Sequence, residues 1–167
     1  MLVRDYARAR LILGTGPELL RSLDEVDQDQ QFDAIINLAG AGIADKRWTG
    51  ARKRLLLSSR LQTTAALVKL CQRLRDRPQV LLSASAVGFY GAHGTEPLTE
   101  TSAVHDEFSH QLCLRWEEEA RKAESLGIRV CIMRFGVVLG PDGGMLGRLL
   151  PMFRLALGGR LDDGRQM

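Results

Sequence analysis

The sequence predicts an α/β fold in which a parallel sheet carries helices across both faces. Three short apolar runs, rich in β-branched residues, alternate with two helical segments of more than a dozen residues each. Each run ends in a turn that contains glycine or serine, at 37–40, 83–88 and 134–138. Right-handed crossovers bring such turns to one edge of a sheet. Because ligands bind outside the carboxyl ends of parallel strands, we expect one cleft there.

The run Phe32–Gly40 is the clearest of the three, since an apolar strand ends at once in Asn, a small residue and Gly. The segments Val80–Ala84 and Ile128–Met133 are the other two expected strands. Before them, the N-terminal part predicts the tail of a strand, a short helix closed by glycines and a further strand, at Leu2–Arg4, Asp5–Leu13 and Pro17–Leu23.

Helical spacing of apolar residues predicts helices at Asp45–Arg77 and Asp106–Leu126. Thr49 is a suitable N-cap for the first, which Pro78 ends. Gly127 is a suitable C′ residue for the second. A last apolar segment, Met145–Leu157, is expected to be interrupted by Pro151. There is no internal repeat.

The bulk properties indicate one domain spanning residues 1–167, with 45% apolar and 26% charged residues. The net charge of +3 comes mostly from dispersed arginines without interleaved aromatics, which gives no support to nucleic-acid binding. No apolar run approaches the roughly 20 residues that span a bilayer. The N-terminus has no signal-peptide pattern, so we expect a cytoplasmic protein that is not bound to a membrane.

The three cysteines, Cys71, Cys113 and Cys131, have neither CxxC nor CxxH spacing. Each lies in an apolar or helical pattern, so buried free thiols are favoured over disulfides or metal ligands. We expect no metal site.

A set of motifs occurs in a characteristic order: NLAG at 37–40, ADKRW at 44–48, SASAVGFYG at 83–91, LC at 112–113 with WE at 116–117, and RFGVVLG at 134–140. Together they resemble the atypical extended short-chain dehydrogenase/reductases of the NAD-dependent epimerase/dehydratase, or sugar-nucleotide epimerase-like, family. The resemblance covers nearly the whole chain. It implies a doubly wound Rossmann fold that binds NADP(H), and a small-molecule substrate such as a nucleotide sugar or a similar alcohol.

The family pattern also contains parts that this sequence lacks. Members begin with a strand and a GxxGxxG turn, whose helix N-terminus holds the cofactor pyrophosphate. No such turn precedes Leu2, and members continue past Met167 into a C-terminal substrate region. We therefore expect a partial Rossmann domain from a protein of roughly 300 residues, a size that is ordinary for a two-part protein. Alone, it should bind the cofactor weakly or not at all. The absent strand should leave an unpaired seam in the sheet.

The candidate cofactor residues lie at the strand ends and on the following helix. The side chain of Arg4 can pair with an adenosine 2′-phosphate, which favours NADP over NAD. The resemblance implies cofactor contacts for Leu38, Ala39, Arg60 and Val138, and the strand-end positions add Asn37, Gly40 and Ser83. The alternatives are an exposed terminal arginine for Arg4, a plain turn for Leu38 and Ala39, a solvated helix arginine for Arg60 and core packing for Val138.

The resemblance implies that Ser85 is the catalytic serine that bonds the reacting carbonyl or hydroxyl. Catalytic relatives pair it with Tyr-x-x-x-Lys, in which Lys lowers the tyrosine pKa and Tyr moves the proton. Aligned on Glu117, those two positions hold Ser109 and Cys113, which cannot do this chemistry. Tyr90 is expected to pack behind its turn, and His110 is expected to lie on the helix surface. Two functions therefore remain: an NADP(H)-dependent oxidoreductase or isomerase, and a non-catalytic NADP(H)-binding or sensing protein.

Overall fold

The structure is a computed structural model in which residues 1–140 and 144–159 are described. Its centre is a three-stranded parallel sheet of β1 (Ala34–Asn37), β2 (Val80–Ala86) and β3 (Arg129–Phe135), in the order β1-β2-β3. Asn37 pairs with Ser83, and Ser85 pairs with Arg134. This register confirms that the three strands run side by side with their carboxyl ends at one edge.

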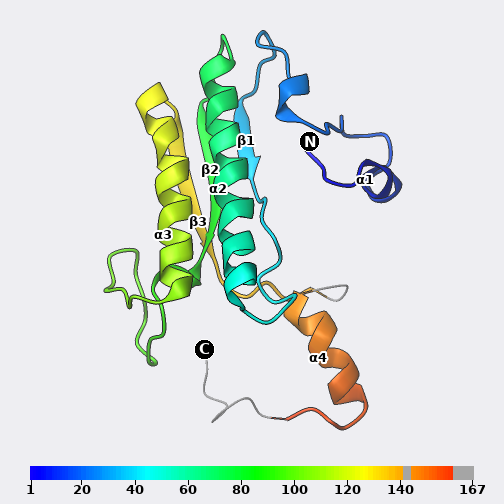
Figure 1. Cartoon of the computed structure of the whole chain (residues 1–167), viewed down its shortest axis with the longest axis vertical. Helices are drawn as coiled ribbons and strands as arrows, with labels where there is room; N and C mark the ends of the chain where they lie inside the picture. The colour runs from blue at the N-terminus through cyan, green and yellow to red at the C-terminus, as the bar shows by residue number, and fades with distance from the viewer. Residues whose placement is uncertain (141–143, 160–167) are drawn as a thin grey trace.

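Two long helices, α2 (Gly50–Arg73) and α3 (Phe108–Arg121), lie side by side in front of the sheet in Figure 1. Helix α2 begins at Gly50, not Asp45, because Thr49 has extended backbone geometry and its side chain accepts a hydrogen bond from the backbone N–H of Arg52. The second predicted helix divides into α3 and the 3₁₀ helix η3 (Lys122–Leu126). Gly127 closes it in the left-handed conformation, with φ of 78°.

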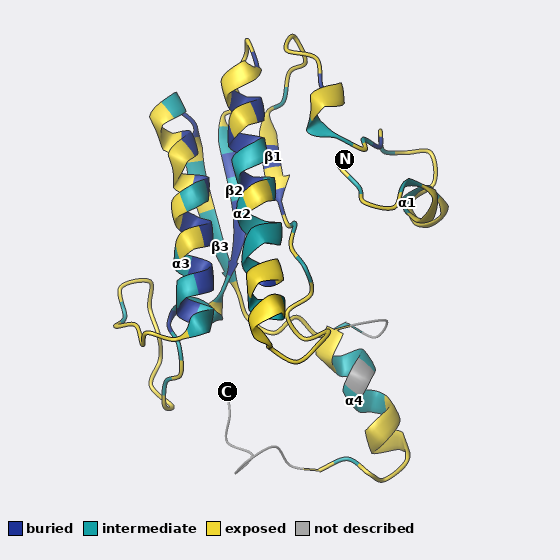
Figure 2. Ribbon diagram, viewed as in Figure 1, coloured by how far each residue is buried: buried dark blue, intermediate teal, exposed yellow. Residues whose placement is uncertain are grey.

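The core lies between the sheet and these two helices. Leu81 of β2 and Cys71 of α2 have no exposed surface, and Ala120 of α3 packs into the same cluster. The opposite face of the sheet differs: Ile36 is 64% exposed and Phe135 42% exposed. Figure 2 shows that the buried residues of α2 and α3 face the sheet. The sequence predicted helices on both faces of the sheet. Within the described residues, the two long helices cover only one of these faces.

The cysteine prediction is correct for Cys71 and Cys113, which are buried free thiols. It is wrong for Cys131, which is free but exposed. In β3, alternate residues point to opposite faces, and Cys131 pairs in register with Leu82 on the face that α2 and α3 do not cover.

The N-terminal segment lies beside the sheet. Helix α1 (Tyr6–Leu13) ends at Gly14 as predicted, whereas Asp5 is its N-cap and not its first residue, and the helix buries none of its residues. The predicted strand Pro17–Leu23 is wrong: a single parallel bridge joins Leu2 to Leu20, and residues Leu23–Glu25 form the 3₁₀ helix η1. The Ser22–Glu25 capping box starts η1 and so prevents a longer strand.

The loop after β3 leads to helix α4 (Gly144–Arg154), which projects from the body in Figure 1. The expected interruption at Pro151 is wrong, because the helix continues through it. Pro151 is exposed, so the helix carbonyl that loses its N–H partner there can bind water. In the described residues, no helix is both long and apolar enough to cross a bilayer.

Candidate cofactor site and the buried network beneath it

The carboxyl edge of the sheet brings predicted site residues from three strands together. Leu38 follows β1 and is 66% exposed, whereas Val138 follows β3 and is 72% exposed. Ser85 lies between them near the end of β2, where it is 3% exposed. The convergence predicted from the three turns is therefore present, but Ser85 is directed into the protein.

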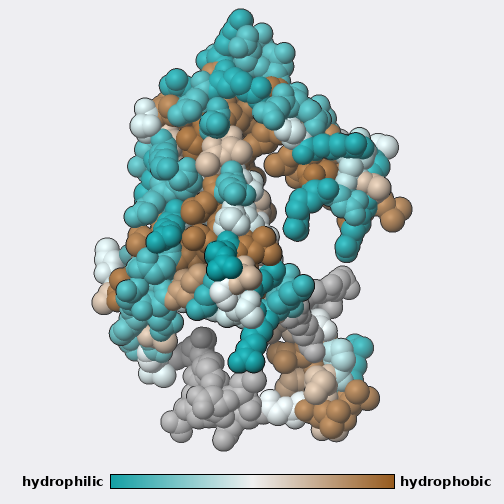
Figure 3. Space-filling model, viewed as in Figure 1, coloured by the Kyte–Doolittle hydropathy of each residue, from teal (hydrophilic) through white to brown (hydrophobic). Residues whose placement is uncertain are grey.

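A cavity of about 890 Å³ opens between the N-terminal segment and the turn after β1. Figure 3 shows the molecule hollowed between the N-terminal segment and the body formed by the sheet and α2. Four predicted cofactor residues line this cavity: Arg4 from one wall, and Leu38, Ala39 and Gly40 from the other. Arg21 adds a second arginine from the N-terminal segment, and Ser59 and Thr63 of α2 also line the cavity. The volume is within the range of small-molecule and cofactor sites.

A buried hydrogen-bond chain holds the turn after β1 from behind. Asn37, 2% exposed, donates from Nδ2 to Thr64 Oγ1 at 2.9 Å and accepts the Ala39 N–H at 3.2 Å. Trp116 Nε1 also donates to Thr64 Oγ1, at 3.0 Å. Ser83 is fully buried and accepts a long 3.5 Å bond from Asn37. The side chains of Asn37 and Ser83 therefore shape the turn and do not face the cavity.

Arg60 braces the same turn from helix α2. Its guanidinium donates to the carbonyls of Ala41 and Leu56, both at 3.1 Å, and lies 5.0 Å from the ring centroid of Trp116. A Cβ added at Gly40 would lie 2.9 Å from Arg60 Cζ, so any larger residue there would require the Arg60 side chain to shift. Burial is the main cause that lowers the pKa of Arg60. The guanidinium is therefore packed under the turn, and its two bonds are to carbonyls of the protein itself.

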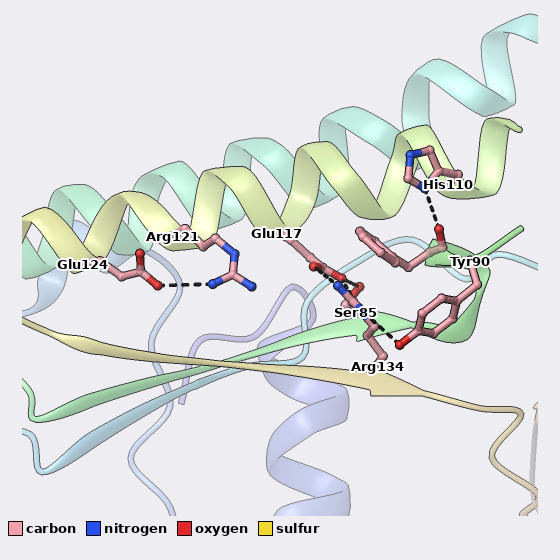
Figure 4. Close-up of polar contacts among 8 residues, drawn as sticks. Ser85, Tyr90, His110, Glu117, Arg121, Glu124 and Arg134 are labelled. Atoms are coloured by element: carbon pink, nitrogen blue, oxygen red, sulfur yellow. Dashed lines mark hydrogen bonds and ion pairs between the residues drawn. The ribbon is translucent and has the colours of Figure 1, made fainter. Parts of the chain in front are cut away.

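Ser85 belongs to a buried polar network that joins α3 to the ends of β2 and β3 (Figure 4). Its hydroxyl donates to Glu117 Oε1 at 2.6 Å. Arg134 forms two bonds of 2.9 Å to the two oxygens of Glu117, and donates from Nη1 to the Tyr90 hydroxyl at 2.9 Å. The Arg134 guanidinium carbon also lies 3.5 Å from the ring centroid of Phe89. The hydrogen bonds that Arg134 donates to Glu117 are the largest cause that raises its pKa, and the bond that it donates to Tyr90 raises it further.

The positions that hold Tyr and Lys in catalytic relatives lie on the first turns of α3. Ser109 packs against the backbone near Gly88, where an added Cβ would lie 3.2 Å from Ser109 Cβ. Cys113 is 4% exposed, and burial raises the pKa of its thiol. A cysteine thiol carries no positive charge that could take the place of the lysine. The described residues thus contain no Tyr–Lys pair at this place.

The two residues considered as substitutes are both buried and bonded. Tyr90 is 6% exposed and its hydroxyl accepts the bond from Arg134. His110 is also 6% exposed, and its Nδ1 donates to the carbonyl of Phe89, which fixes the ring. The expectation that His110 lies on the helix surface is therefore wrong. Within the described residues, no group of three or more His, Cys, Asp or Glu side chains could hold a metal ion.

From the sequence, Glu117 marks a family motif and Arg134 marks both a motif and a strand end, but neither was expected to form a buried pair, and Thr64 was not singled out. One signal was available for the ion pair: Glu117 follows Trp116 on the apolar face of a helix, and Arg134 ends an apolar strand. Charged residues are rarely buried unless they are paired. An acidic residue on an apolar helix face and a basic residue in an apolar strand therefore indicate a buried ion pair. No comparable signal marks Thr64, which has the appearance of an ordinary helix residue.

Residues 17–162 match the model of the NAD dependent epimerase/dehydratase family. The chain belongs to this family. It is 43% identical over 135 residues to the epimerase family protein Mb2239 of Mycobacterium bovis, covering 80% of this chain and 44% of that protein. It is 42% identical over 137 residues to the epimerase family protein YfhF of Bacillus subtilis, covering 81% and 44%.

Solved structures of the epimerase family have the same fold. The human epimerase family protein SDR39U1 (isoform 2), crystallised with NADPH, has a TM-score of 0.80 at 31% identity, covering 99% of this chain and 54% of the other. The nucleoside-diphosphate sugar epimerase of Corynebacterium glutamicum has a TM-score of 0.66 at 36% identity, covering 79% and 27%. The Rossmann-like fold is thereby confirmed. The chain spans about half the length, or less, of these relatives.

Proposed function

We propose that this epimerase/dehydratase family chain binds NADP(H), with the adenosine 2′-phosphate held at Arg4. The observation that carries the proposal is the single cavity that Arg4 shares with Leu38, Ala39 and Gly40. A glycine-bearing turn at a strand end allows a flat or phosphorylated ligand to approach the backbone closely. The opposite wall supplies guanidinium groups, which bind phosphate through charge-assisted hydrogen bonds.

The choice of NADP(H) over NAD(H) depends on charge. Arg4 and Arg21 line the same wall of the cavity, and neither forms an ion pair in the described residues. NADPH carries a 2′-phosphate that these groups can neutralise, whereas NADH presents a hydroxyl there. The NADPH in the structure of human SDR39U1, a relative with the same fold, supports the same choice.

We expect the wild-type chain to bind NADPH about 10-fold or more tightly than NADH, since a hydrogen bond to a charged group contributes about 1.5–3 kcal/mol. Arg4→Ala should remove most of this preference by weakening NADPH binding, with little change for NADH. Titration followed by backbone amide chemical shifts measures both ligands, because it also reports weak binding.

The matched control is Arg8→Ala, an exposed arginine four positions along the chain that does not line the cavity. It should leave the NADPH preference unchanged. Equal affinity of the wild-type chain for NADPH and NADH, or an equal loss in both arginine variants, would contradict the proposed 2′-phosphate site.

For the whole protein, the proposed reaction is hydride transfer between the nicotinamide and a nucleotide sugar or a similar alcohol, as an oxidoreductase or isomerase. NADP(H) would supply the hydride chemistry. Of this chain's residues, Ser85 would contact the reacting oxygen and Val138 would line the nicotinamide side. Val138 is exposed at the correct edge, which supports its part in the proposal.

A second candidate function, NADP(H) binding without turnover, is favoured by one specific observation. The single proton of the Ser85 hydroxyl is directed to Glu117 at 2.6 Å, and Ser109 and Cys113 replace the proton-transfer pair. Single-turnover absorbance of bound NADPH with candidate keto sugars separates the two functions. Loss of absorbance that Ser85→Ala abolishes supports catalysis, whereas stable NADPH with every substrate supports binding alone.

A further inference from the structure

The loop of residues 92–105 leaves the sheet edge after Gly91 and returns to the start of α3. Both of its ends are tied to this edge. The backbone N–H of His105 donates to the carbonyl of Tyr90 at 2.8 Å, and that of Ala92 donates to Glu107 Oε1 at 3.2 Å. Gly91 has a φ of 78°, and an added Cβ would lie 2.8 Å from the carbonyl oxygen of His105. The loop is therefore anchored at its base, close to Tyr90 of the buried network.

Within the loop, His93 joins the two arms. Its Nδ1 lies 2.9 Å from Glu96 Oε1 on one arm, and its Nε2 lies 3.1 Å from the carbonyl oxygen of Ala103 on the other. The side chain is only 10% exposed, although the loop is at the surface. Carboxylate and carbonyl oxygens both accept hydrogen bonds. A neutral imidazole has one N–H and can satisfy only one of them, whereas an imidazolium has two.

We propose that His93 is a proton-operated latch, which as an imidazolium holds loop 92–105 in its closed form through both ring contacts, to Glu96 and to Ala103, and loses one of these contacts when it loses a proton. This inference goes beyond the proposed cofactor binding, because it concerns the loop on the α3 side of the edge and needs no ligand. Deprotonation at Nε2 leaves a lone pair facing the Ala103 carbonyl, and deprotonation at Nδ1 leaves one facing the Glu96 carboxylate. In either tautomer one of the two contacts becomes repulsive, so the loop keeps only one of its two bonds to His93.

The groups around His93 set the pH range in which the latch is closed. Glu96 is the acidic partner, and the carbonyls of Ala103 and Tyr90 also favour the charged ring. The ring of His105 lies 4.6 Å away edge-on, and Glu107 at the start of α3 is bonded to Ala92. The hydrogen bond that His93 donates to Glu96 is the largest cause that raises the pKa of His93 above 6.5, and it outweighs the opposing effect of desolvation. The same bond lowers the pKa of Glu96 below 4.5.

The directions of the two pKa shifts predict that the loop is closed over a pH range with an upper and a lower limit. For His93, the raised pKa means that the contribution of the imidazolium to the closed loop is complete below 6.5 and is lost as the pH rises through the raised value. For Glu96, the lowered pKa means that the contribution of the carboxylate is complete above 4.5 and is lost as the pH falls through the lowered value. The loop should therefore be closed at mildly acidic and near-neutral pH, and open on either side.

NMR on the whole chain without ligand tests the latch. The His93 ring shifts report its titration, and heteronuclear NOE values at residues 94–103 report the order of the loop. We expect the loop to lose order at the pH where His93 titrates, and that pH to lie above 6.5. Glu96→Gln should move both events together to lower pH. His93→Gln should give a loop whose order no longer depends on pH in this range.

Glu100→Gln is the matched control, because Glu100 is an exposed carboxylate of the same loop that is not among the groups acting on His93. It should leave both events at the wild-type pH. A His93 that titrates at or below 6.5, or a loop whose order is the same on both sides of the His93 titration, overturns the proposal. Neither result depends on NADPH, so cofactor binding and the latch are tested independently.

Discussion

Replacing Arg134 by alanine is expected to lower the free energy of unfolding by about 3–5 kcal/mol, the usual cost of removing one partner from a buried ion pair. The Glu117 side chain is 4% exposed and receives two of its hydrogen bonds from Arg134. Without the guanidinium, a buried carboxylate would keep only the Ser85 hydroxyl as a partner. Urea unfolding at neutral pH, followed by tryptophan fluorescence, measures the loss.

The matched control is Arg121→Ala, which breaks another arginine–glutamate pair of the same region (Figure 4). Both side chains of the Arg121–Glu124 pair are 50% exposed, so water already solvates the charges. Exposed pairs contribute about 0–1 kcal/mol. If Arg134→Ala cost no more than Arg121→Ala, the network around Ser85 would not be a buried, desolvated one.

A third variant separates the buried charge from the packing. Replacing both Arg134 with methionine and Glu117 with leucine removes the two charges together. Apolar replacement of a whole buried pair is often neutral or stabilising. We therefore expect the double variant to be more stable than Arg134→Ala alone. A double variant as unstable as the single one would assign the loss to packing against Phe89.

The second large effect is expected for Thr64→Val, a change of one hydroxyl for one methyl at a fully buried site. Thr64 Oγ1 accepts from Asn37 and Trp116, so two buried donors lose their partner. Each unsatisfied buried polar group costs about 1–3 kcal/mol, which predicts a loss of about 2–4 kcal/mol because Asn37 retains a weak contact to Ser83. The same urea experiment measures it.

Thr63→Val is the control on the same helix. Thr63 Oγ1 donates only to the backbone carbonyl of Ser59, which already lies within the helix, and its side chain is half-buried. We expect a change below about 1 kcal/mol, as for substitutions away from buried networks. If the two valine variants were equally stable, Asn37 and Trp116 would be finding other partners, and the turn after β1 would not depend on Thr64.

Much of the fold could be predicted from local patterns, because those patterns act over a few residues. The alternating apolar runs gave three parallel strands with their ends at one edge, and Thr49 and Gly127 marked a helix start and a helix end. The failures concern competition between local signals. The capping box at Ser22 prevailed over the strand pattern of Pro17–Leu23, and an exposed helix tolerated Pro151.

The position of the candidate site was predictable because it depends on the order and direction of the strands. Its side-chain contacts were not predictable. Arg4 and Leu38 were expected to serve one ligand, and one cavity joins them. The partners of Ser85 could not be found in the same way, since Glu117 is 32 positions away and Arg134 49. Polar residues in apolar patterns bond to whichever distant group the packing brings near. That information is not contained in local spacing.

The uncovered face of the sheet has a consequence for how this chain unfolds. Ile36 and Phe135 are already partly exposed to water in the folded state, so they expose less new surface on denaturation than buried core residues do. The heat-capacity increase of unfolding and the slope of stability against urea both scale with newly exposed surface. A chain of 167 residues with a one-sided core should therefore unfold over a broad range of denaturant, with a flat dependence of stability on temperature.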